Sequence, residues 1–357
     1  MQSSISMAAS ASATDMTLYS GAGEPLLHGG DLTVARRLFP GAPEPFIDLS
    51  IGINPFSYPL PQLPPELFAR LPDVAGLHAL ATAAARAYAA PSPAHVVPAP
   101  GTQILLPLVA GLKSPARAAI LAPTYAEHAR TALIAGHTVS EVSDIAALAD
   151  ADLAVVTNPN NPDGRIFART ELLAVAKALR ARGGVLIVDE AFMDVGPPAE
   201  SLAPDAGCGN VVVLRSFGKF FGLAGVRLGF ALAAPPLVER LRSRLGPWPV
   251  SGPAIAIGTA ALSDQAWIAA TRDRLGEATK RLDGILTRTG GRIIGGTSLF
   301  RLIETDAASV LFQHLGRAGI FVRRFGERAL WLRFGLPGST AAWRRLEEAM
   351  AEFRADR

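Results

Sequence analysis

The fold is decided by residues 211–219, which read VVVLRSFGK: a run of aliphatic residues that ends in polar residues and a lysine. A continuous apolar run of this length is typical of a strand buried on both faces of a sheet. The lysine, Lys219, opens the glycine-rich stretch FFGLAG at 220–225. Apolar surroundings lower the pKa of a lysine, and its neutral amine can then attack an aldehyde. A lysine that reaches from a strand end to solvent is the alternative interpretation.

Similar apolar runs recur on both sides of this stretch. We expect further strands at 95–99, 118–122, 138–142, 153–157, 185–189 and 228–233. Helical patterns separate them, notably at 170–182, where apolar residues recur at helical spacing. This alternation predicts an α/β fold with a mostly parallel, seven-stranded sheet and helices on both of its faces.

The pattern changes after Pro253. A long helical stretch runs to about residue 289, and strands at 292–295, 299–303, 320–323 and 331–334 then mix with helices at 308–319 and 340–354. This mixture predicts a smaller α+β domain that both chain ends complete. We expect four parts: a disordered leader at 1–20, an N-terminal arm with part of the small domain at 21–64, the large domain at 65–252, and a linking helix with the C-terminal small domain at 253–357.

Composition excludes several classes of protein. Hydrophobic residues make up 49% of the 357 residues and charged residues 18%, which is too apolar for a disordered chain. The net charge of +3 comes without a basic block interleaved with aromatic residues, so we expect no nucleic-acid surface. The single cysteine, Cys208, excludes an internal disulfide and a cysteine-cage metal site. No apolar stretch is long enough to predict a membrane span, and the serine-rich start lacks the features of a secretory signal, so we expect a cytoplasmic protein without a metal.

Polar or glycine-rich segments follow several predicted strands. Ligands of such sheets bind at the carboxyl ends of the strands, where these segments would meet. The segments are Gly101-Thr102-Gln103, the turn NPNNPDG at 158–164, Asp189 with the residues after it, and Ser216 to Lys219.

Each of these segments has a functional and a plain interpretation. A buried Asp189 would need a cationic or donor partner, although a turn or helix cap is the alternative. Gly101 to Gln103 opens a helical run and could seat an anion, as many helix starts could. Asn161 could direct its amide at a ligand oxygen. Arg227, flanked by small and apolar residues, is expected to be a buried guanidinium that binds a phosphate or carboxylate, with an internal Asp or Glu as the alternative.

Taken together, the motifs resemble those of fold-type I enzymes that use pyridoxal 5'-phosphate (PLP), and within them the histidinol-phosphate aminotransferase branch of the class I and II aminotransferases. The motifs are NPNNPDG at 158–164, VDEAF at 188–192, SFGK at 216–219 and GVRLG at 225–229, in the order and spacing of the family. The resemblance covers most of the chain from about His28 onward. It implies a PLP enzyme whose substrate is a small-molecule phosphorylated amino acid.

The resemblance assigns a role to each matching residue. Lys219 would bind the PLP aldehyde and then move protons, Asp189 would pair with the ring nitrogen, and Asn161 would donate to the ring oxygen. Tyr125 would stack on the cofactor. The cofactor phosphate would be held by Gly101, Thr102, Gln103, Ser216 and Arg227. Arg333 would bind the substrate carboxylate.

The start of the chain resembles, more narrowly, the decarboxylases of this branch that act on L-threonine O-3-phosphate in cobalamin biosynthesis. The matching segments are HGGD at 28–31 and IDLSIGINP at 47–55. The resemblance implies that His28 and Gly29 contact the substrate phosphate, that Asn54 belongs to the substrate site, and that Arg323 is a second phosphate-binding arginine. Phe192 stands where aminotransferases usually have a tyrosine.

Some alternatives stay open at this stage. Arg323 and Arg333 could exchange their carboxylate and phosphate roles, and Arg324 could replace Arg323. An aminotransferase acting on a phosphorylated amine such as histidinol phosphate would use the same residues, and a non-catalytic relative that kept the fold is a third possibility. The resemblance also implies a homodimer with the arm across its interface, although Leu71 replaces a tyrosine that often reaches the neighbouring subunit's cofactor phosphate.

Overall fold

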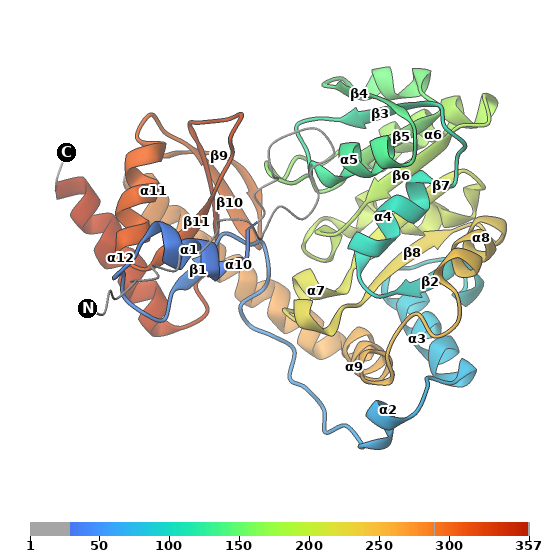
Figure 1. Cartoon of the computed structure of the whole chain (residues 1–357), viewed down its shortest axis with the longest axis horizontal. Coiled ribbons are helices and arrows are strands. Elements are labelled where there is room, and N and C mark those ends of the chain that lie inside the picture. The colour runs from blue at the N-terminus through green and yellow to red at the C-terminus, as the bar shows by residue number, and fades with distance from the viewer. Residues whose placement is uncertain (1–28, 289, 356–357) are drawn as a thin grey trace, which may run out of the picture.

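The computed structural model describes residues 29–288 and 290–355 and contains two sheets, each flanked by helices (Figure 1). The long helix α10 (Gln265–Arg288) runs between the two halves of the molecule. The predicted leader at 1–20 and residues 21–28 of the predicted arm lie outside the described residues. None of the described helices combines the length and the apolar character needed to cross a membrane.

The larger sheet has seven strands in the order β2-β8-β7-β6-β5-β3-β4. All run in the same direction except β8, which is antiparallel to both of its neighbours. The prediction of a mostly parallel seven-stranded sheet is therefore confirmed. The strands are β2 (Val96–Ala99), β3 (Arg117–Leu121), β4 (Thr138–Val142), β5 (Leu153–Thr157), β6 (Val185–Asp189), β7 (Val211–Ser216) and β8 (Gly229–Ala233).

Both faces of this sheet are buried, as the continuous apolar runs require. In β7, Val211 and Val213 belong to the hydrophobic cluster on one face, and Val212 and Leu214 belong to the cluster on the other. Successive side chains of a strand point to opposite faces, so each face needs its own layer of helices. These helices are α3 (Val74–Ala87), α4 (Thr102–Ala110), α5 (Glu127–Ile134), α6 (Arg169–Ala181), α8 (Pro235–Leu245) and α9 (Gly252–Ser263).

The smaller sheet has five strands in the order β1-β11-β12-β10-β9. Strand β1, from the start of the chain, pairs in parallel with β11, from its end, so both chain ends build this sheet. The strands are β1 (Ile47–Leu49), β9 (Arg292–Thr297), β10 (Phe300–Glu304), β11 (Ile320–Arg324) and β12 (Trp331–Gly335). Helix α11 (Ala308–Arg317) packs on β11 and β12, and α12 (Thr340–Ala355) packs on α11 and α10. The exact domain boundaries stay a prediction.

Helix α1 (Leu32–Leu38) lies in the predicted arm, where the sequence pattern indicates no helix. The Asp31 carboxylate accepts hydrogen bonds from the backbone N–H groups of Thr33 and Val34, which fixes the helix start. With seven residues, of which only Ala35 is buried, the helix is too short for an apolar period to stand out. The remaining short helices include α2 (Glu66–Ala69) and α7 (Phe217–Phe220).

Candidate active site

The carboxyl ends of β2, β5, β6 and β7 lie at the same edge of the seven-stranded sheet because these strands run in parallel. Asp189 is the last residue of β6, the segment 216–219 begins with the last residue of β7, and the segments 101–103 and 158–164 come just after β2 and β5. The sheet order places β6 between β5 and β7, so Asp189 lies between the turn that carries Asn161 and the helix that carries Lys219. Segments that are more than a hundred residues apart in the sequence therefore meet at one place.

Asp189 is buried at the end of β6 and is bonded through both carboxylate oxygens. Its Oδ2 lies 3.0 Å from Nε2 of His128, and its Oδ1 accepts a hydrogen bond of 3.0 Å from the backbone N–H of Ala191. His128 is itself buried, at 3% exposure, so this pair is shielded from water. The partner that a buried carboxylate needs is thus a histidine from α5.

Lys219 lies on the short helix α7, close to two arginines, Asp189 and the Phe192 ring. Its Nζ is 5.8 Å from the centre of that ring. The pKa of Lys219 is lowered to about 8, chiefly by burial and also by the charges of Arg333 and Arg227, while Asp189 opposes the shift. A substantial fraction of the amine is therefore neutral at mildly alkaline pH, which is the nucleophilic form.

The start of α4 and Arg227 form a place for an anion. Gly101 has a positive φ of 87°, which favours glycine, and a side chain there would come within 2.7 Å of the Arg227 guanidinium. The free N–H groups of the first helical turn and a guanidinium thus face the same place. Ser216 is buried at the neighbouring end of β7.

One expectation about this place needs correction. Arg227 is exposed rather than buried. Its Nη1 donates to the carbonyl of Ala224, and no carboxylate within the described residues forms an ion pair with it. The resemblance assigns Gln103 to this place as part of the helix start, and its side chain bonds to other side chains of the protein. Its amide nitrogen donates to the Glu127 carboxylate at 2.9 Å and its oxygen accepts from the Tyr125 hydroxyl at 3.1 Å, which leaves the backbone as its part of an anion site.

Tyr125 lies between Gln103 and His128. Its ring meets the His128 imidazole edge to face, with 5.9 Å between the ring centres. Burial raises the pKa of Tyr125 to about 12; the nearby carboxylates of Glu127 and Asp189 add to the increase, and Arg323 opposes it. The phenol is therefore protonated at neutral pH and can donate a hydrogen bond.

Arg323 and Arg333 face each other across the antiparallel pair β11 and β12. Like charges directly opposite each other destabilise a sheet, so a bound anion would relieve this arrangement. Arg333 is 7% exposed, and burial lowers its pKa to about 9; Arg323 contributes to the decrease and Asp48 opposes it. Arg333 donates to the carbonyl of Ser50 at 2.8 Å and to the side-chain oxygen of Asn161, while its buried Nε has no hydrogen-bond partner within the described residues.

Comparison with known proteins places this site in a family. The sequence profile of the family described as "Aminotransferase class I and II" matches residues 46–350. The chain belongs to this family. Its architecture therefore also confirms the predicted fold-type I α/β class.

Among its relatives in the aminotransferase class I and II family are two proteins named threonine-phosphate decarboxylase. One, from a Sinorhizobium species, is 44% identical over 92% of this chain and 98% of its own length. The other, from Pseudomonas aeruginosa, is 41% identical over 92% of this chain and 98% of its own length. A solved structure of the histidinol-phosphate aminotransferase from Sinorhizobium meliloti in complex with pyridoxal-5'-phosphate is 22% identical, with a TM-score of 0.75 over 95% of this chain and 99% of that one, and it shows the shared fold.

The remaining predicted site residues, His28, Gly29 and Asn54, differ in how they lie relative to the candidate site. His28 lies outside the described residues. Gly29 packs against Ser50, and Gly30 donates to the Ser50 hydroxyl at 2.8 Å, so this segment touches the residue whose carbonyl receives Arg333. Asn54 is buried, and its amide is bonded to backbone groups instead of facing the site.

Arg324 does not fit the alternative role that the sequence leaves open to it. It follows Arg323 on β11, so its side chain leaves the other face of the sheet. Its guanidinium lies 4.8 Å from the centre of the Phe312 ring of α11. Arg323 is therefore the arginine of β11 that faces the candidate site, and its interactions with Tyr125 and Arg333 agree with this.

Three contributors are absent from the sequence-based prediction. They are His128 beside Asp189, Glu127 beside Gln103, and Phe300, whose ring lies 5.1 Å from the Arg333 guanidinium and 5.1 Å from the Phe192 ring. The buried Asp189 signals that a donor is needed, but the chain has six histidines and the sequence does not say which one lies nearby.

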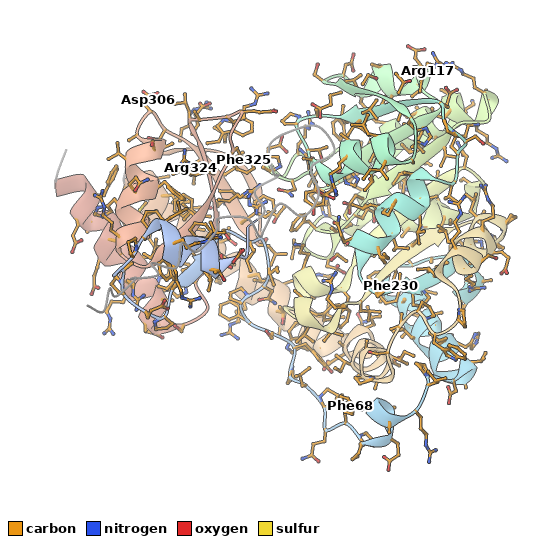
Figure 2. All side chains as sticks on the ribbon, viewed as in Figure 1. Phe68, Arg117, Phe230, Asp306, Arg324 and Phe325 are labelled. Carbon is orange, nitrogen blue, oxygen red and sulfur yellow. The ribbon has the colours of Figure 1, made fainter. Side chains whose placement is uncertain are left out.

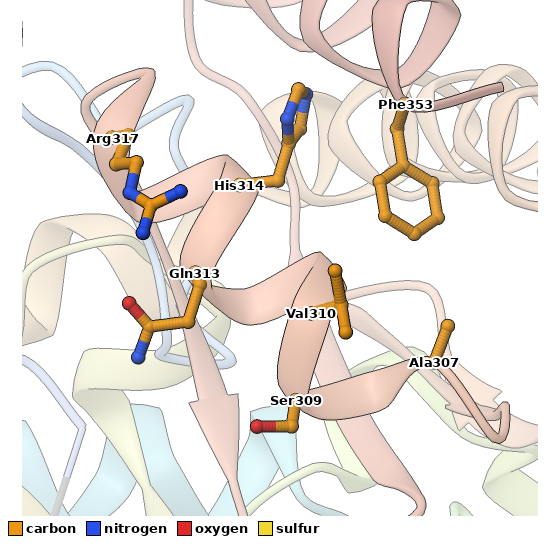
Figure 3. Close-up of a pocket in the computed structure, with 7 residues that line it drawn as sticks. All are labelled: Ala307, Ser309, Val310, Gln313, His314, Arg317 and Phe353. Carbon is orange, nitrogen blue, oxygen red and sulfur yellow. The ribbon is translucent and has the colours of Figure 1, made fainter. Parts of the chain in front are cut away.

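A separate pocket of about 460 Å³ lies on the surface of α11 and α12 (Figure 3). Its lining consists of Ala307, Ser309, Val310, Gln313, His314, Arg317 and Phe353. None of the predicted site residues lines it, and Nε2 of His314 is already 2.7 Å from the carbonyl of Ala349. We assign this pocket no part in the chemistry.

Proposed function

We propose that the protein uses PLP to decarboxylate L-threonine O-3-phosphate, which gives (R)-1-aminopropan-2-yl phosphate and carbon dioxide in cobalamin biosynthesis. The observation that carries this proposal is the similarity of the chain to two relatives named for this reaction. Each is more than 40% identical to the chain over nearly the whole length of that relative. The candidate site supports it because the site combines an amine of lowered pKa with two arginines for a doubly anionic substrate.

The residues of the site fit PLP. Lys219 would bind the aldehyde. Asp189, whose carboxylate is hydrogen-bonded to His128, would pair with the ring nitrogen. The start of α4 would hold the phosphate together with Arg227 and Ser216. Tyr125 and Asn161 would flank the ring. When bound, PLP supplies an electron sink for the pair left behind when a bond to the substrate α-carbon breaks.

The two arginines determine how the substrate is oriented. Arg333 would bind the carboxylate, since its Nε is unbonded and its other nitrogens are fixed by Ser50 and Asn161. Arg323, with Gly29 and His28, would bind the phosphate. Two anchors fix the rotation of the α-carbon, so they select which of its bonds lies perpendicular to the cofactor ring. Orientation of this kind contributes about 7 kcal/mol or more in favourable cases.

Lys219 also holds a proton near the reacting carbon. Because the pKa of its amine is lowered to about 8, it can give and take up a proton near neutral pH. Phe192 lies against Phe300 and offers no hydroxyl where aminotransferases usually have one. It keeps that side of the lysine apolar.

The decisive assay incubates the purified protein and PLP with L-threonine O-3-phosphate alone. We expect one carbon dioxide for each substrate consumed, with no oxo acid added. Turnover that requires 2-oxoglutarate and releases a 2-oxo acid would instead identify the rival, an aminotransferase acting on a phosphorylated amine such as histidinol phosphate. A colourless protein that adding PLP does not change would point to a non-catalytic relative.

We further propose that the protein forms a homodimer. Leu60, Phe68, Leu71 and Val74 expose 62%, 69%, 67% and 84% of their surface and lie within fifteen residues of sequence around α2. Figure 2 shows Phe68 on this segment. Exposed apolar residues gathered in one segment are typical of an interaction surface. Sedimentation equilibrium of the active protein should give twice the mass of the chain. An active species with the mass of one chain would contradict the proposal.

A cytoplasmic location belongs to the same proposal. The lone cysteine, Cys208, is unpaired, which suits a reducing compartment. Recovery of the protein mainly from the membrane or extracytoplasmic fraction of cells would contradict it.

A further inference from the structure

Helix α7, which carries Lys219, is unusually short. It spans only Phe217–Phe220, and its C-cap is Phe221. The last four carbonyl groups of any helix lack partners within the helix, so here almost every carbonyl needs a partner from elsewhere. A helix of one turn is also unstable by itself, because nucleation fixes several residues for a single hydrogen bond. The position of Lys219 therefore depends on contacts from outside α7.

Residues 54–58, which we call the strap, supply those contacts. The backbone N–H of Asn54 donates to the carbonyl of Lys219 at 2.9 Å, and the Asn54 side-chain amide donates to the carbonyl of Phe220 at 2.7 Å. The N–H of Tyr58 donates to the carbonyl of Phe221 at 2.9 Å, and the Ser57 hydroxyl donates to that of Gly222 at 2.8 Å. Four consecutive carbonyls, from 219 to 222, thus receive a donor from one five-residue segment.

Gly222 shows independently how closely the strap approaches. Its φ is +66°, and a side chain on it would lie 2.6 Å from the carbonyl oxygen of Asn54 and 2.9 Å from the α-carbon of Ser57. These contacts are to backbone atoms, which cannot turn aside as a side chain can. Both the conformation and the close approach therefore require glycine at this position.

Asn54 has little capacity left for a ligand. It is 1% exposed, and while its amide nitrogen donates to Phe220, its side-chain oxygen accepts from the N–H of Phe56 at 2.8 Å. The Tyr58 ring at the other end of the strap packs edge to face on Trp267, with 5.1 Å between the ring centres. The strap is therefore fixed at both ends while it caps α7.

We propose that the strap is a positioning element that caps the C-terminal end of α7 and thereby fixes the place of Lys219, with Asn54 as its principal residue. Asn54 then acts on the lysine and not on the substrate. The effect on turnover rests on the proposed function, whereas the effect on the lysine does not.

The effect of the strap on Lys219 can be measured directly, because the chain has only four lysines and each can be followed separately. They are Lys113, Lys177, Lys219 and Lys280. The full-length chain, freed of PLP, is reductively methylated at its amines with ¹³C-formaldehyde and a borohydride reductant, and each lysine signal is titrated by NMR. Lys219→Arg assigns the signal of interest. In Asn54→Ala the helix loses its cap, water reaches the amine, and we expect the pKa of Lys219 to rise from about 8 by about one unit, since desolvation is what lowers it. With PLP and substrate, kcat should fall about tenfold while KM changes less.

Asn210→Ala is the matched control. Asn210 is also a buried asparagine whose amide donates to backbone carbonyls, of Ala176 at 2.8 Å and of Gly184 at 3.2 Å, but it lies away from α7. It should lower stability about as much and leave the titration of Lys219 unchanged. An unchanged Lys219 signal in Asn54→Ala, or an equal shift in Asn210→Ala, would overturn the proposal.

A milder pair keeps the test valid if Asn54→Ala does not fold. Ser57→Ala removes one cap at the exposed end of the strap, and Ser263→Ala removes a comparable hydroxyl bond, of 2.8 Å to the carbonyl of Thr259, elsewhere. A smaller rise in Ser57→Ala alone supports the strap, and no difference between the two variants refutes it. If the lysine shifts as expected but no carbon dioxide forms from threonine phosphate, the cap stands and the proposed function fails.

Discussion

Asp189 and Lys219 lie at the ends of neighbouring parallel strands, β6 and β7, whereas Arg323 and Arg333 face each other across the antiparallel pair β11 and β12. The first pair, on the side of the site that we propose binds the cofactor, owes its position to strand order, because any residue that follows a parallel strand arrives at the same edge. The second pair, on the side that we propose binds the substrate, owes its position to register, and a shift of one residue would turn either guanidinium to the other face. The positions of Asp189 and Lys219 should therefore tolerate changes in the sequence around them, whereas those of Arg323 and Arg333 should not tolerate a change in strand register.

The two substrate-side arginines offer the largest expected effects. Arg333→Lys removes a buried, multiply bonded guanidinium, and we expect kcat/KM for threonine phosphate to fall by about 10²-fold or more, since such truncations cost roughly 2–5 kcal/mol. Arg323→Lys should cause a smaller loss because Arg323 is less buried. The product lacks the carboxylate but keeps the phosphate. Its Kd, measured by calorimetry, should therefore rise in Arg323→Lys and stay nearly constant in Arg333→Lys.

Arg324→Lys is the control for this comparison, because it changes the adjacent arginine on the opposite face of β11 and should leave kcat/KM unaltered. If product affinity falls in Arg333→Lys and not in Arg323→Lys, the two roles are exchanged. If neither variant changes either quantity, the register of β11 and β12 has no part in substrate binding.

The same contrast explains what the sequence can predict. Strand residues such as Val185 to Val188 are apolar without interruption, so the strands, their order of occurrence and the polar residues after them could be predicted. Contacts between distant segments could not. Nothing local in the sequence ties Asn54 to the carbonyl of Phe220 or selects His128 as the partner of Asp189, because these contacts depend on how separate elements pack.

The prediction for Arg227 was wrong for a similar reason. Its small and apolar neighbours suggest burial, but Leu228 is buried while Arg227, with a positive φ of 54°, is exposed. A positive φ is uncommon for a residue other than glycine, and the surrounding composition does not reveal it. The residue still lies beside Gly101, so its proposed place at the cofactor phosphate is unaffected.

On the cofactor side, the charge of Lys219 should make stability depend on pH. Folding lowers the pKa of Lys219 from 10.5 to about 8, so below pH 8 the amine is charged in both states and the folded state bears the full penalty of burying it. Between pH 8 and 10.5 the unfolded state binds more protons, so stability rises with pH. Lys219→Met removes the charge. In the PLP-free chain, it should therefore be more stable than the parent by up to about 3 kcal/mol at pH 7, and this advantage should shrink as the pH approaches 10.5.

Denaturant midpoints of parent and variant at pH 7 and at pH 9.5 measure this difference. Lys177→Met is the control, since Lys177 is exposed on α6 and its substitution should not alter the pH dependence. Identical pH dependence in the parent and in Lys219→Met would mean that the amine is as well solvated in the folded chain as in the unfolded one.

The smallest effect concerns His128, which reaches Asp189 from helix α5 and so does not owe its position to the order of the strands. His128→Phe keeps an aromatic ring against Tyr125 but leaves Oδ2 of the buried Asp189 without its donor. An unsatisfied buried polar group costs about 1–3 kcal/mol, so the free energy of unfolding of the PLP-free chain should fall by that amount. His128→Gln retains an N–H donor and should lose less. If both variants lose the same free energy of unfolding, the hydrogen bond from His128 to Asp189 contributes nothing beyond packing. The Asp189 carboxylate would then be satisfied by the N–H of Ala191 and by solvent, and strand order alone would determine its position.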